Sequence, residues 1–187
     1  MKKLLSILLL CISLIGYSQE RVLYGELTDK GTEGSRLVYF EGALFNGVGF
    51  DVYSDGQLEI EAHHKDGELD GLGKQWYENG QLEIEAHHKD GEIDGLYKEW
   101  YENGQLKAEK NYKDGKEEGL TKTWYQNGQL KSEAHNKDGE LDGLAKYWYS
   151  NGQLEIEANY KDGKEEGLAK IWNEDGQLES EDNFKDG

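Results

Sequence analysis

The chain has 187 residues, with 21 basic residues (lysine and arginine) against 39 acidic ones, and a formal net charge of -18. That charge repels phosphate backbones and anionic lipids, so we expect neither a nucleic-acid partner nor an anionic membrane surface. Hydrophobic residues make up 35% of the chain and proline is absent, which argues against a thick core and excludes collagen and proline-rich segments. The aromatic content of 11% is too high for a disordered acidic chain.

Residues 1–18 have the pattern of a secretory signal peptide. Two lysines precede an apolar run over residues 4–15, and Gly16-Tyr17-Ser18 supplies small residues before a cleavage site. The run is too short to span a membrane. We therefore predict export from a bacterial cell, to the periplasm, the cell surface or the medium. The single cysteine, Cys11, lies in this segment, so no internal disulfide is expected.

Residues 19–46 are less regular than the sequence that follows them. Two stretches, 21–27 and 36–41, flank a turn at 31–35 that contains glycine and serine. We expect the two stretches to pair as a divergent hairpin that caps the N-terminal end of the repeats.

From residue 47 to residue 187 the sequence repeats with a period of 24 residues, giving six units of which the last is incomplete. The unit over 71–94 reads GLGKQWYENGQLEIEAHHKDGEID. Glu78-Asn79-Gly80 and Lys89-Asp90-Gly91 separate runs of six to eight residues, and Asn-Gly and Asp-Gly favour tight hairpin turns. Runs of that length suit strands and not helices, so each unit is predicted to be a β-hairpin.

The register of the hairpin depends on its loop. A two-residue loop sets Trp76 opposite Glu83, whereas a three-residue loop, 78–80, sets Trp76 opposite Leu82. We favour the second register because it gathers apolar side chains on one face. Strict alternation then predicts an apolar face formed by Leu72, Trp76, Leu82, Ile84 and Ala86. The opposite face would carry Gly73, Gln75, Tyr77, Glu83 and Glu85.

These patterns predict an all-β fold, a single-layer antiparallel meander of 24-residue hairpin repeats in which each unit contacts mainly its neighbours, as in a solenoid. Tryptophans recur at one position of the unit, and we interpret them as a structural aromatic column whose members are Trp76, Trp100, Trp124, Trp148 and Trp172.

The stretch Tyr112-Lys113-Asp114-Gly115, followed by Gly119-Leu120-x-Lys122-x-Trp124-Tyr125, shows the repeat most clearly. It resembles the MORN repeat variant, and is similar to the repeat of the YwqK-like family of toxin–antitoxin system antitoxins, over about residues 40–187. The resemblance implies a β-hairpin repeat protein that acts as a scaffold or partner-binding module. Membership of the antitoxin family would imply neutralisation of a cognate toxin by direct binding.

Catalytic and metal-binding chemistry has little support in the sequence. His63-His64 and His87-His88 are adjacent pairs, and neighbours in a strand point to opposite faces, so they cannot chelate one ion together. The Asp-Gly turns lack the twelfth-position glutamate and flanking helices of a calcium loop. No cysteine follows residue 18, and no nucleophile elbow or phosphate-binding loop is present. We predict no enzyme activity, no catalytic residue, no metal and no cofactor.

Binding of another macromolecule, most simply a protein, is therefore the predicted function. The third and fifth positions of the unit vary most between copies, and strict alternation places them on the face of an acidic column. The expected contact residues are Tyr97, Glu99, Glu109, Thr121, Thr123 and Glu133. Their acidity favours a basic protein partner. Two alternatives stay open: toxin neutralisation, and a cell-surface module that stacks glycans on its aromatic columns.

Overall fold

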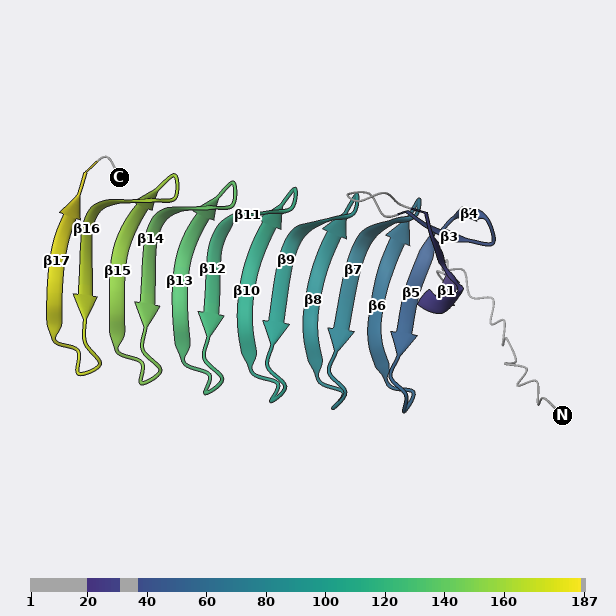
Figure 1. The fold of residues 1–187 in the computed structure, drawn as a ribbon, viewed down its shortest axis with the longest axis horizontal. Helices are drawn as coiled ribbons and strands as arrows, with labels where there is room; N and C mark the ends of the chain where they lie inside the picture. The colour runs from purple at the N-terminus through teal and green to yellow at the C-terminus, as the bar shows by residue number, and fades with distance from the viewer. Residues whose placement is uncertain (1–19, 31–36, 186–187) are drawn as a thin grey trace, which may run out of the picture.

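The computed structural model describes residues 20–30 and 37–185, and nearly all of that part is β-strand. The predicted signal peptide, Cys11 and the turn at 31–35 lie outside the described residues. Figure 1 shows the strands side by side in one layer, with a small cap at the N-terminal end. Within the described part, no helix has the length and apolar composition that a membrane crossing requires.

The cap contains β1 (Glu20–Leu23), the 3-10 helix η1 (Tyr24–Glu26), β2 (Thr28–Asp29), β3 (Val38–Phe40) and β4 (Ala43–Leu44). The repeats begin with β5 (Gly47–Val52), β6 (Leu58–Lys65), β7 (Glu68–Trp76), β8 (Leu82–Lys89), β9 (Glu92–Trp100) and β10 (Leu106–Lys113). They continue with β11 (Lys116–Glu117), β12 (Gly119–Trp124), β13 (Leu130–Lys137), β14 (Glu140–Trp148), β15 (Leu154–Lys161), β16 (Lys164–Trp172) and β17 (Leu178–Phe184).

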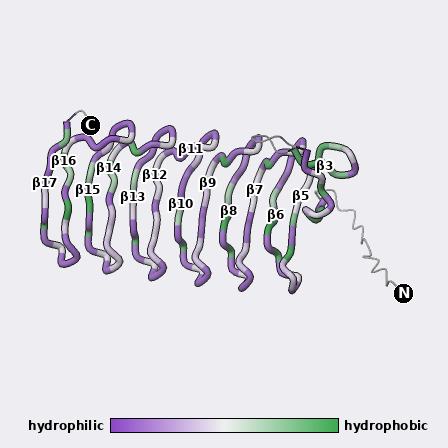
Figure 2. The backbone as a smooth tube through the Cα atoms, viewed as in Figure 1, coloured by the Kyte–Doolittle hydropathy of each residue, from purple (hydrophilic) through white to green (hydrophobic). Residues whose placement is uncertain are grey.

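The repeat strands lie in the sheet in the order in which they follow one another along the chain. The path runs β1-β5-β6-β7-β8-β9-β10-β12-β13-β14-β15-β16-β17, with β11 also beside β10. From β5 onward all pairs are antiparallel. The predicted all-β, single-layer antiparallel meander is confirmed. Figure 2 shows mostly hydrophilic turns along both edges and hydrophobic segments within strands such as β6 and β8.

The two turns of each unit differ. Asp90 and Gly91 have φ values of 50° and 84° and form a two-residue loop between paired Lys89 and Glu92. At the other edge the Tyr77 N–H donates to the Gln81 carbonyl (2.9 Å), and the Gly80 N–H donates to the Tyr77 carbonyl (2.8 Å). Gly80 has a φ of 81°, and Trp76 stands opposite Leu82. The predicted three-residue loop at 78–80 and the Trp–Leu pair are therefore confirmed.

The predicted division of side chains between the two faces is wrong beyond that loop. Trp76 pairs with Leu82 but Gln75 pairs with Ile84, so Glu83 is an extra residue in a β-bulge. A bulge shifts the strand by one residue and moves every later side chain to the other face. Ile84 and Ala86 therefore lie with Gln75 and Gly73, and Glu85 lies with Lys74.

The two faces take their names from the residues that mark them. The alanine face carries a row of small residues that pair across neighbouring strands: Gly49, Ala62, Gly73, Ala86, Ala134, Ala145, Ala158 and Ala169. Five of these alanines are buried, with Ala145 and Ala158 at 0% exposure. The tryptophan face carries the alternate residues of each strand, such as Leu72, Lys74 and Trp76 in β7, and leaves Leu144 and Leu168 exposed.

Each repeat is tied to the next by hydrogen bonds from its loop. The Tyr77 hydroxyl donates to the Trp100 carbonyl (2.8 Å), and the Asn79 amide donates to the Glu102 carbonyl (2.9 Å). The same tyrosine bond recurs from Tyr53, Tyr101, Tyr125 and Tyr149 to the tryptophan of the following unit. Successive repeats are thus joined through the main-chain carbonyls of the tryptophan column.

Replacing Tyr101 with phenylalanine should lower the free energy of unfolding by about 0.5–1.5 kcal/mol, because the Trp124 carbonyl loses its hydroxyl donor. Urea unfolding followed by tryptophan fluorescence would measure the change. Tyr147→Phe is the control, since its hydroxyl bonds to no residue in the described part of the chain. Equal losses in the two variants would contradict a stabilising role for this bond.

The N-terminal cap is built differently from the expected hairpin. Within the described residues, stretches 21–27 and 37–41 do not pair with each other: β1 pairs with β5 in parallel, and β2 pairs with β3 over only two positions. Arg21 reaches over the Phe50 ring (4.9 Å to the centroid) and forms an ion pair with Glu61. Phe45, at 2% exposure, packs between Phe40 and His64, with ring centroids 6.2 and 5.6 Å away. The cap therefore covers the first strand and adds a small core.

Candidate functional site

The structure divides the six predicted contact residues between the two faces. Tyr97 pairs with Ala86 and Lys110, and Thr121 pairs with Ala134, so both belong to the alanine face. Glu99 and Thr123 both stand opposite Ala108 and share that face. Glu109 and Glu133 instead stand opposite lysines on the tryptophan face. The expected common surface is wrong for these two glutamates, because the bulge in each hairpin reverses their orientation.

The acidic column is also neutralised by lysines. Glu109 lies 3.2 Å from Lys98, and Glu133 lies 3.0 Å from Lys122. Equivalent pairs join Lys74 to Glu85, Lys146 to Glu157 and Lys170 to Glu181. Such exposed pairs contribute only about 0–1 kcal/mol each. These pairs matter more for binding than for stability, because they leave little net negative charge along this column to attract a basic partner.

A polar cluster interrupts the row of small residues in the middle of the alanine face. The Lys110 ammonium forms an ion pair with Glu117, and the two side chains are 25% and 26% exposed. The Glu117 carboxylate also accepts hydrogen bonds from the hydroxyls of Tyr112 and Thr121, both at 3.3 Å. The Asn136 amide donates to the Thr121 hydroxyl (3.1 Å). Because its members bond to one another, the cluster is held in place without a ligand.

The surroundings of this cluster fix its protonation. Burial tends to lower the pKa of Lys110, but the hydrogen bond and charge of Glu117 outweigh it and raise that pKa. Burial raises the pKa of both Tyr97 and Tyr112. The rings of these two tyrosines lie edge to face with centroids 5.9 Å apart. At neutral pH the cluster therefore presents a charged ammonium and protonated tyrosine hydroxyls.

A second polar group lies beside it, one row closer to the Asn-Gly loops. Glu99 accepts a hydrogen bond from the Lys107 ammonium (2.6 Å), which raises the lysine pKa. The hydroxyls of Thr123 and Ser132 are 2.6 Å apart. The middle of the alanine face thus offers donors and acceptors over four strands. The same rows elsewhere hold small and apolar residues such as Ile84 and Ala86, and also Gln75, whose amide donates to Glu83.

Sequence reasoning missed the Lys110–Glu117 pair, although the copies contain a signal for it. Lys110 stands where the neighbouring units have Ala86 and Ala134, and Glu117 stands where they have Ile93 and Leu141. Two departures from the repeat in one unit, with opposite charges, indicate a contact. Tyr97, Glu99, Thr121 and Thr123, from the variable third and fifth positions, share one face, but it is the face of Ala86 and not that of Glu85, where strict alternation placed them.

The histidines are placed separately along the strands. His64 is buried at 5% exposure, its Nδ1 lies 3.1 Å from the Ala62 carbonyl, and burial lowers its pKa. His88 leans over Gly73, where an added Cβ would lie 3.2 Å from its ring. Among residues 20–30 and 37–185, no three histidine, cysteine, aspartate or glutamate side chains converge as metal ligands.

The period and the hairpins agree with a known repeat family. The model of the MORN repeat variant matches five stretches, 69–90, 93–114, 117–138, 141–162 and 165–186, which together cover more than half of the chain. The chain belongs to the MORN repeat variant family. The matched MORN repeats correspond to the strand pairs from β7 to β17. No curated protein matches the chain significantly.

Membership in the MORN family fits a surface that binds other molecules. MORN repeats often mediate binding to other molecules. The alanine face combines fixed donors and acceptors with flanking apolar rows, which is the mixture that protein interfaces use.

Proposed function

We propose that this MORN repeat protein is exported and serves as a scaffold that binds another protein across the middle of its alanine face. The observation that carries the proposal is the half-buried Lys110–Glu117 cluster, whose lysine lies in a row that holds alanine in the equivalent strands β8, β13 and β15. Packing of the sheet does not require charge at this position, since Ala158 fills it at 0% exposure two units later. Polar contacts with a partner would explain why a charged pair occurs at this position.

Two neighbouring glutamates provide a matched test. Glu99 and Glu109 lie on successive strands and opposite faces, and each is paired with a lysine, Lys107 and Lys98. Affinity purification of residues 19–187 from the cell envelope, followed by mass spectrometry, would identify the partner. Its affinity for the unaltered chain and for each charge-reversed variant is then measured.

Glu99→Lys is expected to weaken binding by about tenfold or more, as when an interfacial charge pair is broken. Glu109→Lys is expected to leave the affinity nearly unchanged, because its side chain lies on the tryptophan face. Thermal unfolding of both variants controls for damage to the fold. Loss of binding in Glu109→Lys alone would move the interface to the tryptophan face.

Toxin neutralisation is one specific form of this function, supported by the resemblance of the repeats to those of YwqK-like antitoxins. It predicts that the captured partner inhibits growth when expressed alone and that the scaffold relieves the inhibition. Glycan binding on the partly exposed tryptophans is the other form. It predicts capture on a glycan or peptidoglycan array that Trp124→Ala abolishes and Glu99→Lys does not.

A further inference from the structure

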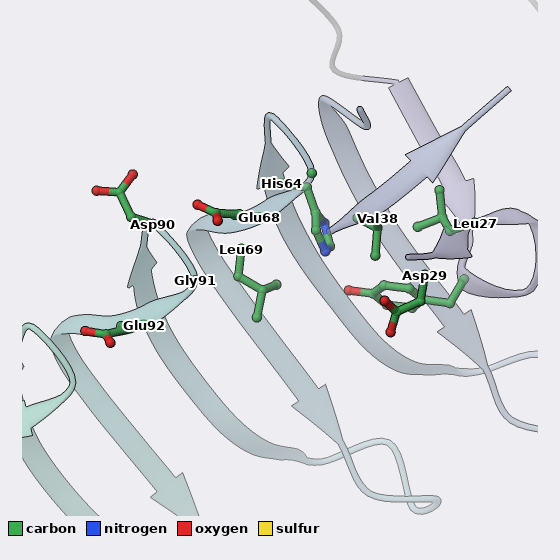
Figure 3. A pocket seen from close by; sticks show the side chains of 11 residues that line it. Leu27, Asp29, Val38, His64, Glu68, Leu69, Asp90, Gly91 and Glu92 are labelled. Atoms are coloured by element: carbon green, nitrogen blue, oxygen red, sulfur yellow. The ribbon is translucent and has the colours of Figure 1, made fainter. Parts of the chain in front are cut away.

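A cavity of about 620 Å³ lies between the cap and the first repeats. Leu27, Asp29 and Val38 line it from the cap, and His64 and Leu69 line it from the sheet. Figure 3 shows these two groups facing each other, with Glu68, Asp90 and Glu92 along the rim formed by the Asp-Gly turns. Its volume falls within the ~300–1,000 Å³ of sites that hold small ligands or single side chains.

The inner wall of this cavity, here called the cap cavity, combines apolar and aromatic side chains with Asp29. The rings of Tyr24 and His64 lie edge to face with centroids 5.8 Å apart. Burial raises the pKa of Tyr24 to about 12 and lowers the pKa of His64, so both rings are neutral at pH 7. With Nδ1 of His64 donating to the Ala62 carbonyl, its Nε2 keeps a lone pair. No lysine or arginine is among the described residues that line the cavity.

The rim is acidic, although Lys65 and Lys89 stand opposite Glu68 and Glu92 across their turns. Within the described part of the chain, no lysine or arginine forms an ion pair with Glu68, Asp90 or Glu92. The column of glutamates on the tryptophan face differs, since lysines neutralise it. The cap cavity therefore combines apolar and aromatic side chains with rim carboxylates that form no ion pair within the described residues.

We propose that the cap cavity binds an arginine side chain of the protein partner. A planar guanidinium stacks on aromatic rings and pairs with carboxylates in a bidentate manner, and its methylene stem suits apolar walls such as Leu69. This inference rests on the proposed function, since the same partner would make both contacts. His64 and Leu69 pair across strands as Tyr112 and Glu117 do two units later, about 19 Å along the sheet at ~4.8 Å per strand.

The test uses a small probe and needs no partner. N-acetyl-arginine amide is titrated into 15N-labelled residues 19–187, and backbone amide shifts are followed by NMR. We expect saturable shifts centred on Leu69, Gly91 and Glu92, with a Kd of about 1–10 mM, as befits a fragment of this size. N-acetyl-citrulline amide, which is neutral and nearly isosteric, should produce no saturable shifts.

Repeat equivalence supplies a matched control. Glu92 and Glu140 occupy the same position of their units and are both exposed, but only Glu92 borders the cap cavity. Glu92→Gln should weaken arginine binding about threefold or more, and Glu140→Gln should leave it unchanged. Equal binding of the citrulline probe, or equal effects of the two substitutions, would overturn the proposal.

The two proposals can fail separately. If the arginine probe binds as expected while Glu99→Lys leaves partner affinity unchanged, the cap cavity stands and the alanine-face interface is wrong. If Glu99→Lys weakens the partner complex while the probe shows no saturable shifts, the interface stands and the arginine site is wrong.

Discussion

Replacing Phe45 with alanine should destabilise the N-terminal end of the sheet by about 3–5 kcal/mol, the range for a fully buried phenylalanine. Phe45 is 2% exposed and packs against the rings of Phe40 and His64. Its main chain also joins the cap to the first repeats, because its N–H donates to the Val38 carbonyl (3.0 Å) and its carbonyl accepts from the Gly67 N–H (2.9 Å). No other described side chain of comparable size is so deeply buried.

The loss is expected to be local, because each repeat contacts mainly its neighbours. Hydrogen exchange of Phe45→Ala should show faster exchange in β1 and β5 while β13 to β15 keep their protection. Phe184→Ala is the control. Phe184 is 38% exposed on the last strand, so its replacement should lower the free energy of unfolding by under about 1 kcal/mol. Uniformly faster exchange in all strands would argue for one cooperative core instead.

Replacing Ala134 with lysine should lower the free energy of unfolding by about 2–4 kcal/mol. Ala134 is 7% exposed, and the residue that would face the new ammonium is Leu141, so a charge would be buried without a partner. Ala158→Lys is expected to lower the free energy of unfolding by less than about 1 kcal/mol, although Ala158 is more deeply buried than Ala134. Its unit already contains Glu165, which accepts a hydrogen bond from Tyr160 as Glu117 does from Tyr112.

A double variant completes this comparison. Adding Leu141→Glu to Ala134→Lys should recover about 1–2 kcal/mol, because it recreates the Lys110–Glu117 pair one unit later. Urea unfolding of the single and double variants measures the coupling. Equal losses in Ala134→Lys and Ala158→Lys would show that the carboxylate does not decide whether the row tolerates a lysine.

The period, the hairpins and the register at the Asn-Gly loop could be predicted because turn residues and the Trp–Leu pair recur in every copy. The arrangement of the faces could not. A bulge leaves no mark in the spacing of apolar residues, so alternation carried past Glu83 placed Ile84 and Ala86 on the wrong side. Salt bridges from Lys98 and Lys122 depend on the same bulge.

Differences between the copies predicted which candidate residues lie together. The face on which they lie could not be predicted, because the bulge in the strand sets it. Tyr97 and Thr121 vary between copies and lie on the alanine face, opposite the side on which strict alternation placed them. Glu109 and Glu133 recur in every unit, and their repetition reflects pairing with lysine on the other face. A cap was predicted, but its strand pairing was not, because β1 pairs in parallel with β5 and no local turn indicates that contact.

The bonds between successive units have a consequence for how such a chain changes its length. The Tyr77 hydroxyl and the Asn79 amide both donate to main-chain carbonyls, of Trp100 and Glu102, so the acceptor does not depend on side-chain identity. Any copy can therefore follow a copy that carries this tyrosine. Duplication or loss of a 72-nucleotide segment would add or remove one complete module while preserving every junction. The gene can lengthen this surface in steps without redesigning it.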